Sequence, residues 1–171
     1  MIRLDRHLEH WIVAHRVAWL DWLFVGLSRI GTLGLVWVAV ALGLAVLWRR
    51  PSIAVTVVVA VAGADLAADV GKFLVHRHRP YEHQLGPSER THSFPSGHAA
   101  TSFAAATVLS SFAPRFRVAF YALATLIAYS RLSNGVHYPT DVVAGALVGV
   151  LTGRLLLAGA RRRSRRGSRG G

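Results

Sequence analysis

The stretch IAVTVVVAVAGADLAADVG, residues 53–71, is apolar over nearly its whole length and contains only two charged side chains. A hydrocarbon core of about 30 Å is crossed by roughly 20 helical residues, so this stretch is long enough for a transmembrane helix. One such run could also be the buried helix of a soluble protein. The chain repeats the pattern, however, in four further apolar runs, at residues 30–48, 99–113, 118–129 and 142–160.

Five apolar runs in a chain of 171 residues argue against a soluble core and for a bundle of membrane helices. The composition agrees, because 53% of the residues are hydrophobic and the mean hydropathy is +0.39. Two of the runs are short, and we expect them to borrow flanking residues. The Ala, Ser and Thr residues of ATSFAAATVLSS (100–111) suit close helix packing in lipid. We therefore predict an all-α integral membrane helical bundle with five or six transmembrane helices.

Residues 4–28 differ from these runs because their apolar residues recur at helical spacing between charged ones. Arg16 and Asp21 interrupt a membrane span, whereas the three tryptophans of this segment are typical of the headgroup region. We interpret residues 4–28 as one amphipathic interfacial helix, within an N-terminal unit of residues 1–29. A sixth span is the alternative. No small-residue cleavage site follows a short apolar core, so a cleaved signal peptide is not expected.

The net charge of +12 comes from arginines between and after the apolar runs. The segment RRRSRRGSRGG, residues 161–171, has the composition of a disordered tail. An Arg-rich tail can bind nucleic acid, but one that directly follows an apolar run is better explained as a cytoplasmic tail facing anionic lipid. With the tail inside, five spans place loops 72–96 and 131–139 together outside the plasma membrane. The membrane-embedded domain is then residues 30–160.

These two loops contain most of the remaining polar chemistry. Loop 72–96 begins with Lys72, the single lysine of a chain that has nineteen arginines, and Arg79 follows seven residues later. The segment SRLSNGVHYPTD, residues 130–141, supplies Arg131. Three fixed cations are suited to a multiply charged oxyanion, most simply phosphate.

The PSGH segment, residues 95–98, opens the third apolar run. Ser96 is a favourable N-cap residue, and Gly97 lets a ligand approach the backbone closely. A helix that begins there directs its N–H groups and the positive end of its dipole at an anion. His98 lies in the first turn of that helix.

His137 and Asp141 lie four residues apart around Pro139, which suits a helix start. An Asp in that position can hold the His ring in one tautomer. A His paired with Asp can attack phosphorus, and a second His, here His98, can protonate the leaving oxygen. The sequence has no carboxylate cluster for Mg²⁺ and no cysteine, so we predict no metal and no cofactor.

Three segments together resemble the signature motifs of the type 2 phosphatidic acid phosphatase superfamily. They are K-x6-RP at residues 72–80, PSGH at 95–98 and SR-x5-H-x3-D at 130–141, in the family's order and spacing. With the runs between them they cover about residues 30–160. The resemblance implies an all-helical bundle with its site at the extracytoplasmic edge.

The resemblance also implies a role for each motif residue. His137 would be the nucleophile that forms a phosphohistidine, oriented by Asp141, and His98 would be the general acid. The residues that would bind the phosphoryl oxygens are Lys72, Arg79, Ser96, Gly97 and Arg131.

Other polar residues near the motifs receive structural interpretations. Asp69 precedes Lys72 by three residues, which predicts an ion pair that steadies Lys72. Asp65 is either a buried partner or faces water. Arg77 is interpreted as a lipid-headgroup contact. Packing is expected of Tyr81 and Tyr138, and solvated positions of His76, His78, His83 and His92.

A site at a membrane interface favours a lipid phosphate or diphosphate as substrate. Undecaprenyl diphosphate or a related polyprenyl phosphate is favoured, because an outward-facing site suits the recycling of cell-envelope lipids. Phosphatidylglycerophosphate, phosphatidate and a polyprenyl-phosphosugar are the alternatives. A vanadium-dependent haloperoxidase would use the same anion pocket, but the apolar runs argue against a soluble relative. A non-catalytic membrane protein would not need the two histidines and Asp141. No pattern in the sequence predicts an oligomeric state.

Overall fold

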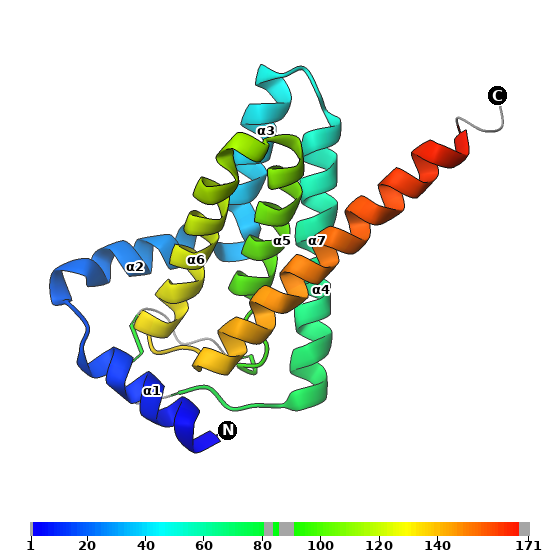
Figure 1. Ribbon diagram of the computed structural model, residues 1–171. Coiled ribbons are helices and arrows are strands. Elements are labelled where there is room, and N and C mark those ends of the chain that lie inside the picture. The colour runs from blue at the N-terminus through cyan, green and yellow to red at the C-terminus, as the bar shows by residue number, and fades with distance from the viewer. Residues whose placement is uncertain (1, 81–83, 86–90, 168–171) are drawn as a thin grey trace.

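The computed structural model describes residues 2–80, 84–85 and 91–167, and it is all-helical over this part of the chain (Figure 1). Each of the five apolar runs contains a helix, which confirms the predicted all-α class. In chain order the elements are α1 (Ile2–Ala14), α2 (Ala18–Ile30), the 3-10 turn η1 (Thr32–Gly34), α3 (Leu35–Leu47), α4 (Ser52–Val75), α5 (Gly97–Phe112), the 3-10 turn η2 (Pro114–Phe116), α6 (Arg117–Ser133) and α7 (Pro139–Gly167).

Helix α5 is the centre of the bundle, and α4, α6 and α7 pack against it (Figure 1). Eleven of its sixteen residues are buried, and most of these are Ala, Ser or Thr. Such small side chains let neighbouring helices come close to the α5 backbone. The buried indole of Trp37 on α3 donates a hydrogen bond to Ser102 of α5 at 3.0 Å, which joins α3 to the central helix.

A stripe of glycines fixes α7 against α5. Gly145 and Gly149 follow one another at a spacing of four, and a methyl group on either would overlap a carbonyl oxygen of α5 or of its N-cap. Gly153 continues the stripe one turn later. The two helices therefore touch through their backbones, which brings their first turns together. At that point the backbone N–H of Ser96 donates to the carbonyl oxygen of Asp141 at 2.9 Å.

Two helices of the described residues, α4 and Pro139–Arg162 of α7, are long and apolar enough to cross a membrane. The bent pair α2 and α3, with 66° between the two helices, would make a third span if taken together. The outer face of α7 supports this assignment, because four leucine and valine residues lie 59–66% exposed on it, at 143, 147, 151 and 155. A membrane protein is thus supported, while the predicted total of five or six spans stays a prediction.

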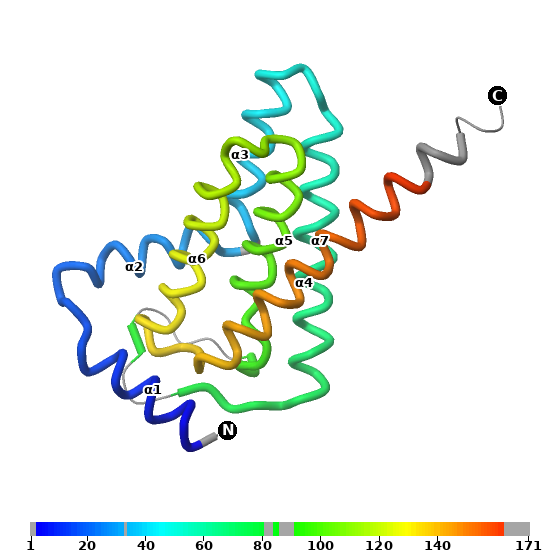
Figure 2. Tube along the Cα trace, viewed as in Figure 1, coloured from blue at the N-terminus to red at the C-terminus, as the bar shows by residue number. Residues whose placement is uncertain are grey.

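The N-terminal segment does not form the single helix predicted over residues 4–28. It forms α1 and α2, which meet at a sharp turn around residues 15–17 (Figure 2). Side chains at the turn satisfy the last carbonyl groups of α1: the His15 ring bonds the Trp11 carbonyl at 2.8 Å, and Arg16 donates to Val13 at 3.2 Å. A second nitrogen of Arg16 donates to the carbonyl of Ser133 at 3.1 Å, which ties the turn to the end of α6.

The arginine-rich tail also differs from its expectation. Disorder was predicted from residue 161, but α7 continues through the arginines to Gly167. Arginine is a good helix former, and a helix that is already nucleated adds residues at little cost. Residues 168–171 of the predicted tail lie outside the described residues.

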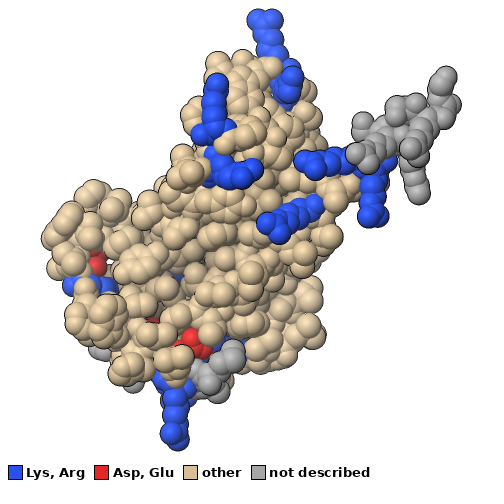
Figure 3. Space-filling model, in the orientation of Figure 1, with Lys and Arg blue, Asp and Glu red and all other residues tan. Residues whose placement is uncertain are grey.

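The two ends of the bundle differ in charge. The turns at residues 48–51 and 113–117 and the distal part of α7 up to residue 162 form the basic end of the molecule, and their arginines stand out from the surface in Figure 3. The end of α4 and the starts of α5 and α7 meet at the opposite end, beside α1 (Figure 1). The three sequence motifs lie at this second end.

Candidate active site

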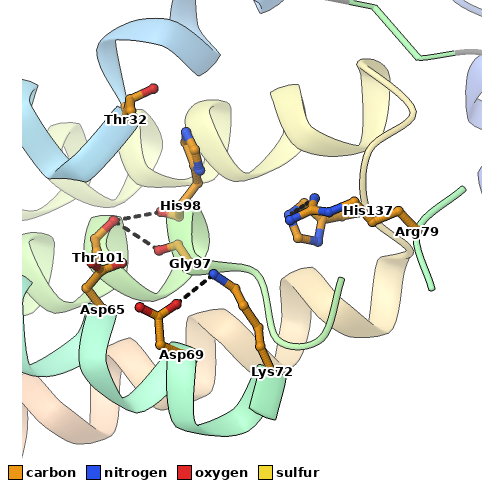
Figure 4. A pocket seen from close by; sticks show the side chains of 10 residues that line it. Thr32, Asp65, Asp69, Lys72, Arg79, Gly97, His98, Thr101 and His137 are labelled. Atoms are coloured by element: carbon orange, nitrogen blue, oxygen red, sulfur yellow. Dashed lines mark hydrogen bonds and ion pairs between the residues drawn. The ribbon is translucent and has the colours of Figure 1, made fainter. Parts of the chain in front are cut away.

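A pocket of about 350 Å³ opens where the three motifs meet (Figure 4). Five of the eight predicted site residues line the pocket. Asp65 and Asp69 of α4 also line it, together with three residues of α5 and of the turn after α2 that were not predicted for the site. The predicted residues are Lys72, Arg79, Gly97, His98 and His137; the three additional ones are Gly31, Thr32 and Thr101.

The His137 ring is almost fully buried, with 1% of the side chain exposed, and its two nitrogens face different groups. Nε2 lies 3.0 Å from Nη1 of Arg79. A guanidinium can only donate, so Nε2 is an acceptor and the ring proton belongs on Nδ1. Nδ1 lies 3.6 Å from Oδ2 of Asp141. Nε2 therefore lies on the pocket side, and its lone pair accepts the hydrogen bond from Arg79 while the pocket holds no substrate.

Asp141 is fully buried behind His137, in the first turn of α7. Its Oδ2 accepts a hydrogen bond at 2.9 Å from the backbone N–H of Tyr138, the residue before Pro139. This is the reciprocal half of a capping box, in which a side chain of the first turn reaches back to the N-cap residue. The motif thus uses helix capping to hold the carboxylate near the ring, as the sequence predicted.

Arg79 is held rigidly, with only 3% exposure. Its Nε donates to the carbonyl of Thr91 at 2.7 Å, and Nη1 donates to the carbonyl of Val136 at 2.9 Å. Nη2 donates to the hydroxyl of Thr91 at 3.1 Å. These bonds hold the guanidinium in place, and the Nη1 hydrogen directed at Nε2 of His137 is the one that can turn to an anion in the pocket.

Lys72 reaches the same pocket from the last turn of α4. Its ammonium lies 2.9 Å from Oδ1 of Asp69, which confirms the predicted ion pair. Asp65, one turn earlier, also lines the pocket. In Figure 4 these three side chains of α4 lie together on one side, and His137 and Arg79 approach from the other.

The PSGH segment forms the start of α5 as predicted, with Ser96 as the extended N-cap residue. Gly97 lines the pocket, and a Cβ there would lie 3.6 Å from both Asp65 Oδ1 and Lys72 Nζ. Ser96 does not line the pocket. Its backbone N–H is used by α7, and its buried hydroxyl has no hydrogen-bond partner among the described residues.

His98 and Arg131 are connected through a residue that the sequence analysis missed, Ser28 of α2. Nε2 of His98 lies 3.0 Å from the carbonyl oxygen of Ser28, and Arg131 donates to the hydroxyl of the same serine. A carbonyl only accepts, so Nε2 carries a proton and Nδ1 is the nitrogen that can exchange a proton with a substrate. Arg131 is buried and does not line the pocket. The one sequence feature that could have pointed to Ser28 is that it is the single serine of a mostly apolar helix.

Arg77 was interpreted as a lipid-headgroup contact, and that interpretation is wrong. Its side chain is 18% exposed and donates to the carboxylate of Asp141 at 2.7 Å. It also forms an ion pair at 2.8 Å with Asp5 of α1. No sequence pattern joins residues that lie 72 positions apart, so only the fold could reveal the contact.

The interpretations of the loop histidines and of the two tyrosines are confirmed in part. His76 and His78 are exposed, while the half-buried His92 provides a carbonyl to Arg79 at 3.3 Å. The Tyr138 ring packs beneath the guanidinium of Arg77 at 4.1 Å. His83 and Tyr81 lie outside the described residues. Within the described ranges, no group of three or more His, Asp or Glu side chains is placed to hold a metal ion.

Comparison with known proteins places this geometry in a family context. Residues 53–165 match the family model described as the PAP2 superfamily. An undecaprenyl-diphosphatase of Sulfolobus acidocaldarius is 33% identical over 141 residues, which cover 79% of this chain and 68% of that protein. A decaprenylphosphoryl-5-phosphoribose phosphatase of Mycobacterium tuberculosis is 36% identical over 150 residues, which cover 82% of each. The crystal structure of a transmembrane PAP2 type phosphatidylglycerolphosphate phosphatase from Bacillus subtilis matches with a TM-score of 0.77 and 25% identity, over 94% of this chain and 86% of that one.

Proposed function

The chain belongs to the PAP2 superfamily, and from that premise we propose that it is a membrane lipid phosphatase that acts without metal through a phosphohistidine on His137. The family predicted from the three motifs is thereby confirmed. The observation that carries the proposal is the orientation of the His137 ring. Its Nε2 lies at the pocket beside Arg79, and its Nδ1 faces Asp141.

In the first step, the Arg79 N–H that bonds Nε2 of His137 turns to a phosphoryl oxygen, the freed lone pair of Nε2 attacks phosphorus, and the bond to the leaving oxygen breaks. Lys72 and Arg79 meet the phosphoryl oxygens from two sides, and the N–H groups at the start of α5 face the same position. The positive charge that develops on the imidazole is stabilised by the Asp141 carboxylate. A proton from His98 goes to the leaving oxygen, so a phosphomonoester releases an alcohol and a diphosphate releases a singly protonated lipid phosphate.

In the second step, water attacks the phosphohistidine and the N–P bond breaks. His98, now neutral, takes a proton from that water, by the reverse of its first role. Inorganic phosphate leaves, and both histidines return to their starting states. Both steps use only groups of this chain and one water molecule.

The direct test is phosphate release in detergent from a panel of substrates: undecaprenyl diphosphate, phosphatidylglycerophosphate, phosphatidate and a polyprenyl-phosphosugar phosphate. We expect release from at least one of them, with undecaprenyl diphosphate as the first candidate. Turnover should survive EDTA, and vanadate should inhibit because it mimics the five-coordinate phosphoryl group. Loss of turnover in EDTA that Mg²⁺ restores would overturn the metal-free scheme.

One observation favours the phosphosugar as a second candidate. Two carboxylates, Asp65 and Asp69, line the pocket beside the phosphate-binding cations. Sugar hydroxyls could donate hydrogen bonds to carboxylates, whereas the second phosphate of a diphosphate would meet them as like charges. The relative from Mycobacterium tuberculosis, whose name specifies a phosphoribose substrate, agrees with this alternative.

The two candidates can be separated with Asp65→Asn. If the carboxylate repels a second phosphate, the variant gains activity on undecaprenyl diphosphate relative to the phosphosugar. If the ratio of the two kcat/KM values does not move, Asp65 does not select between these substrates. Asp21→Asn on α2 is the matched control, because Asp21 does not line the pocket.

We further propose that the site faces the outside of the plasma membrane and that the C-terminus is cytoplasmic. The basic turns and the distal part of α7 lie at the end of the bundle opposite the site, and basic segments favour the cytoplasmic side. A reporter fused after Gly171 should read as cytoplasmic, and one inserted near Gly86 should read as outside. The reverse result would move the chemistry to the inner leaflet and contradict a role in envelope-lipid recycling.

A further inference from the structure

Helix α1 buries two carboxylates against the rest of the bundle while leaving large apolar side chains exposed. Asp5, Glu9 and Val13 follow one another at helical spacing and are buried, while Leu4 and Trp11 are 63% and 57% exposed. A helix that packed for hydrophobic burial would have the opposite orientation. The inward face of α1 meets α6 and α7, so its buried carboxylates must be explained by what they contact there.

Asp5 caps α7 from outside that helix. Its Oδ1 accepts from the backbone N–H of Thr140 at 3.2 Å, and its Oδ2 accepts from the Thr140 hydroxyl at 2.5 Å. The backbone N–H groups of a first turn have no partner within their own helix, and a carboxylate there also meets the positive end of the dipole. Burial alone would raise the pKa of Asp5, but the bonds to Thr140 and Arg77 hold it below its usual range. Asp5 is therefore ionised at neutral pH.

Arg77 connects this cap to the reacting residues. One nitrogen, Nη2, binds Asp5 at 2.8 Å, and the other, Nη1, donates to Thr140 Oγ1 and Asp141 Oδ1, each at 2.7 Å. The ring of Tyr138 covers the guanidinium. Arg77 thus occupies one oxygen of Asp141, and the other oxygen is the one that faces Nδ1 of His137.

We propose that Asp5 and Arg77 are positioning residues of the reaction: Asp5 fixes the guanidinium of Arg77, and Arg77 fixes the carboxylate that orients His137. The proposal rests on His137 being the nucleophile of the proposed function. It makes α1 part of the catalytic unit, although no residue of α1 lines the pocket. Arg77 also supplies the countercharge that a fully buried carboxylate requires.

The first experiment compares kcat and KM of the full-length protein with those of Asp5→Asn, which keeps the shape of the side chain and removes its charge. We expect kcat to fall about 10- to 100-fold, since misplacing a reacting group by about 1 Å can cost 10²-fold. KM should change less than about twofold, because the phosphate ligands Lys72 and Arg79 are untouched.

A double-variant cycle distinguishes positioning from general loosening. If Asp5 acts through Arg77, then Asp5→Asn combined with Arg77→Met is no slower than Arg77→Met alone. The control is Arg16→Met, which loosens the same N-terminal segment from α6 and should keep the wild-type kcat. Losses that multiply in the double variant, or a slow Arg16→Met, would overturn the proposal.

A second pair of variants applies if Arg77→Met does not fold. Thr140→Val removes the hydroxyl that bonds both Asp5 and Arg77, whereas Thr140→Ser keeps it. Thr140→Val should lower kcat at unchanged KM, and Thr140→Ser should restore most of the rate. Equal rates for the two variants would count against the network.

A readout independent of turnover separates this proposal from the proposed function. Ring ¹⁵N NMR of His137, assigned by its loss in His137→Gln, should show the proton on Nδ1 in both proteins, because Arg79 donates to Nε2, and a shifted Nδ1–H resonance in Asp5→Asn, because the carboxylate that faces Nδ1 has moved. If no substrate releases phosphate, the proposed function fails while this measurement still decides the positioning. An Nδ1–H resonance that is unchanged in Asp5→Asn refutes the proposal.

Discussion

Arginine serves two different purposes at the two ends of this bundle. At the site end, Arg77, Arg79 and Arg131 have most of their surface buried, and each donates to named oxygen or nitrogen acceptors. At the basic end, arginines such as Arg49 and Arg115 are exposed, and the guanidinium of Arg115 lies over the rings of Phe116 and Trp48. A buried guanidinium acts through its geometry, whereas an exposed one at a membrane surface acts through its charge. Substitutions at the two ends should therefore have unequal effects.

The largest effect short of removing the nucleophile is expected for Asp141→Asn. The amide keeps the shape of the side chain but cannot stabilise the imidazolium, and it can turn a donor toward Nδ1. We expect kcat to fall about 10⁴-fold, as measured for the equivalent change in a Ser-His-Asp triad. Steady-state turnover checks this, with Asp21→Asn as a control that should retain activity. A loss of less than about tenfold in Asp141→Asn would show that the buried groups at the site end do not act through their geometry.

A smaller loss is expected for His98→Ala, about 10² to 10⁴ in rate, because only the proton donor is removed. A substrate with a good leaving group, such as p-nitrophenyl phosphate, needs little protonation and should rescue this variant substantially. The same substrate should hardly rescue His137→Ala. Equal rescue of both variants would mean that the two histidines do not divide the chemistry as assigned here.

Next in size is Lys72→Arg. An ammonium is a compact charge, whereas a guanidinium is a wide planar fork that does not fit the same contact with Asp69 and a phosphoryl oxygen. Losing a charge-assisted hydrogen bond of about 1.5–3 kcal/mol corresponds to a decrease of roughly 10- to 100-fold in kcat/KM. Turnover at low and saturating substrate measures it. A rate equal to that of the wild type would show that Lys72 acts through charge alone.

The smallest effect is expected at the basic end. Arg49→Lys and Arg115→Lys keep the charge at exposed positions, so stability should stay within about 0.5 kcal/mol and turnover within about twofold. Thermal unfolding in detergent and phosphate release measure both. A large loss here would show that the exposed arginines also depend on geometry, and the comparison of the two ends would fail.

Local patterns predicted the parts of the site that local structure builds. The PSGH segment indicated a helix start, and the spacing of His137 and Asp141 indicated a carboxylate near a ring; both are consequences of helix geometry over a few residues. The Lys72–Asp69 pair followed from a spacing of three on one helix.

Contacts between distant segments could not be predicted in this way. Ser28 meets His98 and Arg131 only because α2 packs beside α6, and Asp5 meets Arg77 only because α1 turns its Asp5 side toward the bundle. The break between α1 and α2 depends on Arg16 reaching Ser133 across the fold. Hydropathy predicted a span from each of five apolar runs, but among the described residues only α4 and α7 are each long and apolar enough alone. The central α5 is buried by its neighbours and is less apolar than a lipid-facing helix needs to be.

The covalent intermediate tests the central claim most directly. Wild-type protein mixed with ³²P-labelled substrate and quenched rapidly should carry acid-labile, base-stable label, as a phosphohistidine does. His137→Ala should carry none, because the attacking nitrogen is gone, while His98→Ala should still accept label from a substrate with a good leaving group. Label that persists on His137→Ala would contradict the account, because another residue would then be the nucleophile.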